Sequence, residues 1–266
     1  MTKTALIAGG GSLPDIWLER AQEAGRRVFV YKISEEDTQV LQGADKIRSI
    51  SLGKLGDLIA RMEEDGIEDI IMLGKVHKDK LYDNIELDGK MKALLAELPD
   101  YQDETILKGI AFSLKKAGFN ILPQDIYLDT SRLEPGTLYM PDDLDGEFQD
   151  DFQISLELAR KMAELEIGQT VLVKDGTVLA VEAVEGTDEA IRRAGNLGGP
   201  GAVMAKASRP EQDDRLDRPT VGPRTLNELA KIDAAGLVIE SRGVFVLEQE
   251  KVVEKAREAG IAVKVI

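Results

Sequence analysis

The chain has 266 residues and a net charge of −15 at pH 7, with 43% apolar and 31% charged residues. This length and composition are those of a globular protein with one large or two small domains. The charge argues against binding to nucleic acid or to an anionic membrane by electrostatic attraction. Cysteine is absent and His77 is the single histidine, which excludes disulfides, thiolate chemistry and a zinc site of His and Cys ligands. Catalysis must therefore rely on carboxylates, Lys, Arg, hydroxyls and backbone amides, and a bound metal should be an oxygen-preferring ion such as magnesium.

The first half alternates predicted strands and helices. Residues 4–8 are continuously apolar, as in a strand that is buried on both faces. The pattern predicts strands at 4–8, 28–33, 46–52, 67–73 and 120–127, and helices at 13–24, 55–64, 90–97 and 104–116. Alternation of this kind predicts a mainly parallel sheet with right-handed crossovers, and so a Rossmann-like α/β domain over residues 1–130.

A glycine-rich turn, Gly9-Gly10-Gly11-Ser12, lies at the carboxyl end of the first predicted strand. Ligands of parallel sheets bind at such ends, and the amides and dipole of the following helix favour a phosphate group. Pro14 fits the first helical turn, and Asp15 stands at the capping-box position from Ser12. Pro14 also replaces the third glycine of the dinucleotide fingerprint, and a turn without any ligand is the alternative. The candidate substrate-binding residues here are Gly10, Gly11, Ser12 and Leu13.

A second polar segment, Gly74-Lys75-Val76-His77-Lys78, follows another predicted strand end. We expect Lys75 to contact a phosphate of the substrate, and His77 is of the residue type that can exchange a proton near neutral pH. For His77 a solvated loop position is the favoured alternative.

Residues 131–149 mix prolines and glycines with five acidic residues and predict a connector between domains. Residues 150–266 then predict a separate C-terminal domain of α/β or α+β type. Asp175-Gly176 is typical of a β-hairpin turn, and residues 196–201 read as a flexible turn. The predicted strands are 170–174, 178–184, 202–207, 237–239, 244–247 and 261–265, and the predicted helices are 151–165, 187–193, 225–232 and 249–259.

The acidic loop, defined here as residues 209–218, has neither helical nor strand periodicity and carries four carboxylates and three arginines. A polar loop of this length inside a compact domain is usually functional. In an extended stretch Asp213, Arg215 and Asp217 project to one side. Two carboxylates around a guanidinium suit the binding of a divalent ion or a water beside a phosphate held by Arg. The alternative is a surface loop of salt-bridged charges.

Three motifs together resemble the LpxI family of UDP-2,3-diacylglucosamine pyrophosphatases in lipid A biosynthesis. They are G-G-G-S-L-P at 9–14, E-G-T-D-E at 185–189, and K-A-S-R-P-x-Q-D-x-R-x-D-x-P-T-x-G-x-x-T from Lys206. The resemblance runs from end to end. It implies a magnesium-dependent hydrolysis in which water attacks the α-phosphorus, giving UMP and 2,3-diacylglucosamine 1-phosphate (lipid X). The alternatives are a non-catalytic sugar-nucleotide or lipid X binding protein and a nicotinamide-dependent oxidoreductase.

The resemblance also implies roles for individual residues. We expect the essential catalytic aspartate within 212–217, with Asp213 ranked first and Asp217 second, and with Arg215 as a catalytic cation. Asp188, Asp213 and Asp217 are the expected magnesium ligands. The further positions expected to bind substrate are Gly186, Thr187, Lys206, Gln212, Thr220 and Gly222.

Expected location and partners follow from the same features. The apolar runs are far shorter than the roughly 20 residues of a membrane-spanning helix, and the N-terminus has no signal-peptide pattern. We therefore expect a cytoplasmic protein. The lipid-linked UDP-sugar substrate implies a transient contact with the inner membrane surface. The assembly state stays open, with a homodimer as one candidate.

Overall fold

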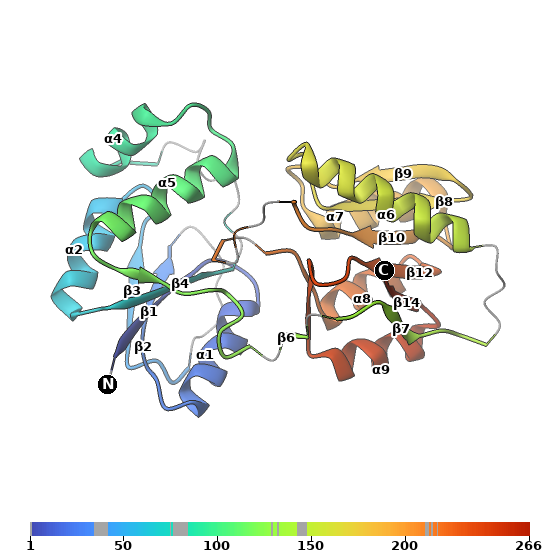
Figure 1. Cartoon of the computed structure of the whole chain (residues 1–266), viewed down its shortest axis with the longest axis horizontal. Coiled ribbons are helices and arrows are strands. Elements are labelled where there is room, and N and C mark those ends of the chain that lie inside the picture. Colours follow the sequence, from blue (N-terminus) through green and yellow to red (C-terminus); the bar gives the residue numbers. More distant parts are fainter. Residues whose placement is uncertain are drawn as a thin grey trace. The chain divides into compact units, whose positions relative to one another are not determined.

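The computed structural model describes residues 2–34, 42–74, 76, 85–128, 130–131, 133–142, 148–210, 213, 215–216 and 218–266. The chain forms two compact units (Figure 1). The first unit contains Met1–Leu128 and Asp213–Asp217, and the second contains Asp129–Gln212 and Arg218–Ile266. The division after Leu128 lies close to the predicted boundary, whereas the central part of the acidic loop belongs to the first unit and not to the C-terminal domain.

The first unit is built on a parallel five-stranded sheet with the order β3-β2-β1-β4-β5. Its strands are β1 (Lys3–Ala8), β2 (Arg27–Ile33), β3 (Lys46–Ile50), β4 (Asp69–Leu73) and β5 (Asn120–Ile121). Its helices are α1 (Leu13–Glu23), α2 (Leu55–Asp65), α4 (Gly89–Glu97) and α5 (Asp103–Lys116).

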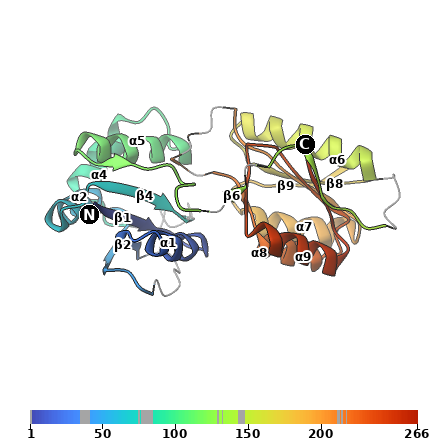
Figure 2. The ribbon, with the colours of Figure 1, turned by 60° about the horizontal axis from the view of Figure 1, so that its bottom comes forward.

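Helices cover both faces of this sheet. Alternate strand residues such as Ala5 and Ile7 pack in one cluster with buried side chains of α2, α4 and α5. Helix α1 contacts β1 and β2 and lies on the opposite side of the sheet from α5 (Figure 2). Trp17 of α1 is fully buried, and its indole Nε1 donates to the carbonyl of Ile126 at 2.7 Å. Burial on both faces explains why the inner strands β1 and β4 are mainly apolar, whereas the edge strand β3 is largely exposed and carries Lys46 and Arg48.

The second unit contains a mixed six-stranded sheet with the order β7-β14-β12-β10-β8-β9. Strands β10, β12 and β14 run parallel, while β7, β8 and β9 are antiparallel to their neighbours. The strands are β7 (Gly136–Tyr139), β8 (Thr170–Lys174), β9 (Thr177–Val181), β10 (Val203–Lys206), β12 (Gly236–Ile239) and β14 (Ala262–Val265). A small three-stranded sheet has the order β11-β13-β6, with β6 (Thr130–Ser131), β11 (Thr220–Val221) and β13 (Phe245–Leu247).

Four helices flank the larger sheet. Helix α6 (Gln149–Glu164) packs on the face that carries Val171 and Val173, and the alternate residue Leu172 faces the opposite cluster. That second face is covered by α7 (Thr187–Gly198), α8 (Pro223–Ala230) and α9 (Gln249–Ala259), as Figure 2 shows. Among the described residues, no helix is both long and apolar enough to cross a bilayer.

Several predicted elements differ from the structure. The strand expected at 120–127 ends at Ile121, because Pro123 cannot donate a hydrogen bond to a sheet and a turn follows. Helix α7 continues through Gly198, so half of the expected flexible turn is helical; the chain reverses only at Gly199, whose φ is +63°. The strands predicted at 237–239 and 244–247 follow each other in sequence but do not pair, since β12 and β13 belong to different sheets.

The predicted connector at 131–149 also contains regular structure. Strand β7 pairs antiparallel with β14 and so forms one edge of the larger sheet. The short sequence Gly-Thr-Leu-Tyr, flanked by prolines, lacks the length that would distinguish a strand from a linker.

Candidate functional site

The glycine-rich turn joins the carboxyl ends of two neighbouring strands. The amide of Gly9 donates to the carbonyl of Leu73 at 2.8 Å, which ties the end of β1 to the end of β4. Gly74 has a φ of +92°, and a Cβ there would lie 2.7 Å from the carbonyl carbon of Gly9. Only glycine fits this close approach of two backbones. Gly10, Gly11, Ser12 and Leu13 therefore lie where a parallel sheet binds ligands, at the N-terminus of α1.

The predicted capping box at this helix is wrong. Ser12 is the N-cap residue, but its side chain makes no capping hydrogen bond. Asp15 Oδ2 is buried and has no hydrogen-bond partner among the described residues. Burial raises the pKa of Asp15 accordingly. The turn thus presents a helix N-terminus to a ligand, with a partly buried carboxyl group in the first helical turn.

Asp213 and Arg215 form a tight pair in the first unit. The guanidinium of Arg215 donates from Nε to Asp213 Oδ1 at 2.9 Å and from Nη2 to Oδ2 at 2.7 Å. The backbone amide of Arg215 also donates to Asp213 Oδ1 at 2.9 Å, and the amide of Leu216 donates to the Asp213 carbonyl. The two side chains are therefore brought together by a turn, in which an Asp side chain accepts from the backbone two residues on. The extended conformation expected for this stretch is wrong.

Leu216 fixes this turn to the first unit. Its side chain is only 4% exposed and belongs to the hydrophobic cluster formed by the sheet with α2, α4 and α5. Leu216 therefore packs the turn that carries Asp213 and Arg215 against the core of the first unit.

The protonation behaviour of Asp213 limits its chemical roles. The Arg215 side chain lowers the pKa of Asp213, with smaller contributions from the Arg215 amide and from Lys108. A carboxylate with a lowered pKa is a weak base at neutral pH. Orienting Arg215, a water molecule or a cation therefore suits Asp213 better than removing a proton.

A second polar cluster surrounds Lys206 at the end of β10 in the second unit. Lys206 is only 5% exposed, and its Nζ lies 3.0 Å from the hydroxyl oxygens of both Thr170 and Thr187. Glu182 Oε2 lies 3.6 Å from the same nitrogen. The Thr187 hydroxyl donates to Glu182 Oε1 at 2.7 Å. The two hydroxyls accept hydrogen bonds from the ammonium group, and Glu182 adds an ion pair, so Lys206 is held by partners within the protein. The geometry therefore favours a role for Lys206 in holding the start of α7, while direct contact with substrate stays a prediction.

The remaining predicted residues of the second unit lie at two helix starts. Gly186 precedes α7, and Gly222 precedes α8. Asp188 Oδ2 accepts from Arg224 Nη2 at 2.8 Å, which links these two starts. Thr220 donates from its hydroxyl to the carbonyl of Arg218 at 3.1 Å. Gly186, Thr187, Asp188, Lys206 and Gly222 thus belong to one connected region of the second unit.

The described residues do not assemble a metal site. Nowhere in the described part of the chain do three or more carboxylate or imidazole groups converge on a position for an ion. Asp188 is paired with Arg224, and Asp213 with Arg215. Asp217 lies outside the described residues, as do Lys75, His77 and Gln212. The magnesium ligands expected from the sequence therefore stay a prediction.

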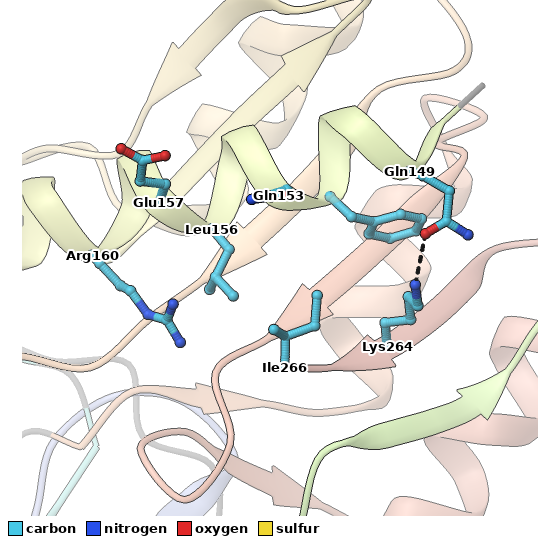
Figure 3. A pocket seen from close by; sticks show the side chains of 8 residues that line it. Gln149, Gln153, Leu156, Glu157, Arg160, Lys264 and Ile266 are labelled. Atoms are coloured by element: carbon cyan, nitrogen blue, oxygen red, sulfur yellow. Dashed lines mark hydrogen bonds between the residues drawn. The ribbon is translucent and has the colours of Figure 1, made fainter. Parts of the chain in front are cut away.

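A groove of about 450 Å³ in the second unit contains none of the predicted residues. It lies beside α6, with Arg160 and Lys264 at its rim and Ile266 at the chain end (Figure 3). Its other apolar lining residues, Phe152 and Leu156, are each only 2% exposed. The groove therefore offers little apolar surface to an acyl chain.

Glu182 and Thr170 are polar residues that the sequence analysis missed. The hairpin signal at Asp175-Gly176 was sufficient to place Glu182 near Thr170, whose carbonyl accepts from the Glu182 amide. No signal in the sequence places β8 beside β10, and only that pairing sets Thr170 opposite Lys206.

Replacing Thr187 by Val tests the Lys206 cluster. The change keeps the shape but removes the hydroxyl that bridges Lys206 and Glu182, so we expect a loss of about 1–3 kcal/mol in the free energy of unfolding. Urea unfolding followed by far-UV circular dichroism measures it. Thr187→Ser should recover most of the loss. Thr177→Val, at an exposed strand position, is the matched control and should change little. Equal stability of Thr187→Val and the wild type would contradict the bridging role.

Comparison with known proteins adds independent information. Residues 3–131 match the model of the LpxI N-terminal domain, and residues 136–264 match that of the LpxI C-terminal domain. The chain is also 30% identical over 279 aligned residues to the UDP-2,3-diacylglucosamine pyrophosphatase LpxI of Caulobacter vibrioides. That alignment covers 99% of this chain and 97% of the relative. Because both domain models match in order and together span nearly the whole sequence, this chain belongs to the LpxI family.

Proposed function

We propose that this protein is an enzyme that hydrolyses the pyrophosphate bond of UDP-2,3-diacylglucosamine in lipid A biosynthesis. The observation that carries the proposal is the similarity, over 99% of the chain, to a relative named for this activity. Water attacks the α-phosphorus, and the bond from that phosphorus to the bridging oxygen breaks. The products are UMP, which contains the oxygen of the water, and 2,3-diacylglucosamine 1-phosphate, which keeps the bridging oxygen.

The charged residues of the described sites suit this chemistry. A pyrophosphate repels an incoming nucleophile, and fixed positive groups offset that repulsion in the transition state. Arg215 supplies a guanidinium whose direction is set by Asp213. Asp213 stays ionised because Arg215 lowers its pKa. In this proposal the pair holds a phosphate oxygen and the attacking water in line, and no His or Cys is required.

The first unit is the proposed nucleotide-binding part of the enzyme. The order β3-β2-β1-β4-β5 supports a Rossmann-like interpretation, because the chain direction across the sheet reverses between β1 and β4. The glycine-rich turn follows β1 at that point, and the helix N-terminus behind it favours a phosphate. We propose that Gly10, Gly11, Ser12 and Leu13 contact the UDP moiety there.

A divalent cation is a further part of the proposal, although Asp188 and Asp213, the two expected ligands among the described residues, are paired with arginines. Magnesium when bound would neutralise charge on the pyrophosphate oxygens. We expect an excess of chelator to lower turnover by at least about 10-fold, with recovery on adding magnesium. Release of UMP at fixed substrate concentration is the measurement. Full turnover in excess chelator would exclude the cation from the reaction.

Hydrolysis in water enriched in heavy oxygen tests the proposed function. Mass spectrometry should find the label in UMP and not in the sugar 1-phosphate. Label in the sugar 1-phosphate would instead indicate attack at the β-phosphorus. Binding of the substrate without release of UMP would favour a non-catalytic binding protein. Binding of a nicotinamide cofactor, measured by titration, would favour the oxidoreductase that Pro14 argues against.

The location and assembly of the enzyme follow as proposals from its substrate. We propose that it works at the cytoplasmic face of the inner membrane and contacts that surface only while it takes up the lipid-linked substrate. A homodimer is the proposed assembly, and sedimentation at several protein concentrations tests it.

A further inference from the structure

The turn from Glu240 to Gly243 touches the chain on both sides of the acidic loop. Glu240 follows the last residue of β12, and Ser208 lies two residues beyond the end of the neighbouring parallel strand β10. The amide of Glu240 donates to the Lys206 carbonyl at 3.0 Å. Glu240 and Ser208 therefore leave the sheet together at its carboxyl edge, the edge at which parallel strands position ligands.

Glu240 holds the chain immediately before the loop. Its Oε2 accepts from the Ser208 amide at 2.8 Å and from the Ser208 hydroxyl at 2.7 Å. Its Oε1 accepts from Arg160 Nε at 2.7 Å. Burial alone would raise the pKa of Glu240, but the two Ser208 bonds and the Arg160 pair outweigh burial and lower it. The carboxylate is therefore charged at neutral pH and strengthens each of these hydrogen bonds.

Gly243 closes the same contact from the other side. A Cβ at this position would lie 2.2 Å from Ser208 Oγ and 2.9 Å from Glu240 Oε2. No side chain larger than hydrogen fits without moving Ser208. The Ser208 side chain is therefore closely packed between the Glu240 carboxylate and Gly243.

The same turn holds the last residue of the acidic loop. Arg218 Nη2 lies 3.3 Å from the carbonyl oxygen of Arg242 and 3.4 Å from that of Gly243. The guanidinium carbon of Arg218 lies 4.3 Å above the ring of Phe245, within the range of a cation–π contact. Arg218 is 9% exposed, and the amide of Phe245 donates to the Pro219 carbonyl at 2.9 Å. Ser208, just before the acidic loop, and Arg218, its last residue, are thus both fixed to one short segment of the second unit.

We propose that the Glu240–Gly243 turn anchors Ser208 and Arg218, which lie on either side of the segment that belongs to the first unit, and that Glu240 is thereby a positioning residue for Asp213 and Arg215. This inference deepens the proposed function, because it assigns a role to residues that none of the motifs contains. Fixing Ser208 and Arg218 reduces the conformational entropy that Asp213 and Arg215 lose when they take up the reactive geometry. Displacement of a reacting group by about 1 Å can cost about 100-fold in rate.

Trypsin cleavage measures loop anchoring separately from catalysis. Arg209 and Arg218 both precede prolines, which block cleavage, so Arg215–Leu216 is the one trypsin site within the acidic loop. Cleavage there yields fragments 1–215 and 216–266. In Glu240→Ala we expect this cleavage to quicken by on the order of 10-fold, because the Ser208 end is released. We also expect kcat for UDP-2,3-diacylglucosamine to fall by on the order of 10- to 100-fold with a smaller change in KM.

Three further variants complete the experiment. Gly243→Ala displaces Ser208 by a different route and should give the same two changes, which keeps the test available if Glu240→Ala does not fold. Glu240→Gln keeps an acceptor oxygen and should lie between Glu240→Ala and the wild type. Glu134→Gln is the matched control, since it breaks an exposed ion pair to Arg242 in the same turn; its cleavage and turnover should equal those of the wild type.

The outcomes separate this inference from the proposed function. If wild-type protein releases no UMP but Glu240→Ala is cleaved faster at Arg215, the proposed function fails and the anchor stands. If folded Glu240→Ala and Gly243→Ala are both cleaved and both turn over like the wild type, the anchor is overturned. Faster cleavage with unchanged kcat would likewise overturn the positioning role of Glu240.

Discussion

Asp213→Asn is expected to lower kcat for UDP-2,3-diacylglucosamine by about 100-fold or more, with substrate binding largely retained. The Asn side chain has nearly the same shape but carries no charge. Its amide nitrogen cannot accept a hydrogen bond, so one of the two hydrogen bonds from the Arg215 guanidinium is lost. Arg215 would then lose its direction toward the developing charge. Steady-state release of UMP measures kcat, and calorimetric titration with substrate measures binding.

Asp57→Asn is the matched control for this variant. Asp57 also pairs with an arginine of the first unit: Arg61, four residues further along α2, lies 2.9 Å away. Loss of that pair should leave turnover unchanged.

Arg215→Ala should be about as inactive as Asp213→Asn, and the double variant no worse than either, because the two residues act as one unit. If Asp213→Asn retains wild-type turnover and Asp217→Asn loses it, the essential carboxylate is Asp217.

The pH dependence of turnover also tests whether Asp213 is the essential carboxylate. Arg215 lowers the pKa of Asp213 below the ordinary carboxyl value of 3.8. A reaction that needs this carboxylate ionised should therefore keep its rate as the pH falls to that value. In Arg215→Ala the pKa rises, so the acid limb of the residual rate should move to higher pH. An acid limb that stays in place would show that another group controls it.

Secondary structure of the first unit could be predicted well because its inner strands, such as β1 and β4, are buried on both faces. A continuous apolar run such as residues 4–8 and the glycine-rich turn after it are local signals, and β1 and α1 begin and end close to the predicted residues. The short strands β6, β7 and β11 gave no such signal, since two to four residues are too few for a period. Pairing partners such as β7 with β14 are more than a hundred residues apart in sequence and could not be inferred from local pattern.

The sequence directed attention to the charged residues of the candidate site but not to their geometry. The lack of Cys and near-lack of His directed attention to Asp213 and Arg215, and the structure places these two side chains together. Leu216 looked like an ordinary residue on the other side of an extended loop, but it is the contact that assigns the loop to the first unit. Glu240 carries no motif, and only the parallel pairing of β10 with β12 brings it to Ser208.

An ion network around Asp65 holds the edge of the first unit together. Asp65 is the last residue of α2, where the helix dipole disfavours a negative charge. Its Oδ1 accepts from Lys46 at 2.6 Å and from Arg48 Nη2 at 2.9 Å, and its Oδ2 accepts from Arg48 Nε at 2.9 Å and from the Tyr31 hydroxyl at 2.8 Å. The side chain is only 5% exposed. One buried carboxylate therefore ties β2 and β3 to the end of α2.

Removing the Asp65 carboxylate should destabilise the first unit, because the positive charges of Arg48 and Lys46 would lose their shared partner. Asp65→Ala removes the shared anion and leaves Arg48 and Lys46 close together without it, at an expected cost of about 3 kcal/mol in the free energy of unfolding. Trp17 is the single tryptophan and is buried in the first unit, so its fluorescence during urea unfolding reports on this unit. Glu64→Gln is the matched control: Glu64 also pairs with Arg48, at 3.0 Å, but its side chain is 69% exposed. That variant should unfold at the wild-type urea concentration.

Acid should weaken the wild type through the same carboxylate. The Arg48 hydrogen bonds, followed by those of Lys46 and Tyr31, lower the pKa of Asp65 in the folded state despite its burial. A lowered folded-state pKa means that the unfolded chain binds the proton more readily, so this contribution is fully present above the unfolded value of about 3.9 and is lost as the pH falls below it. The stability difference between wild type and Asp65→Ala should therefore shrink steadily below about pH 4. A difference that stays constant from neutral pH to pH 3 would mean that packing, and not the ionised carboxylate, accounts for the stabilisation.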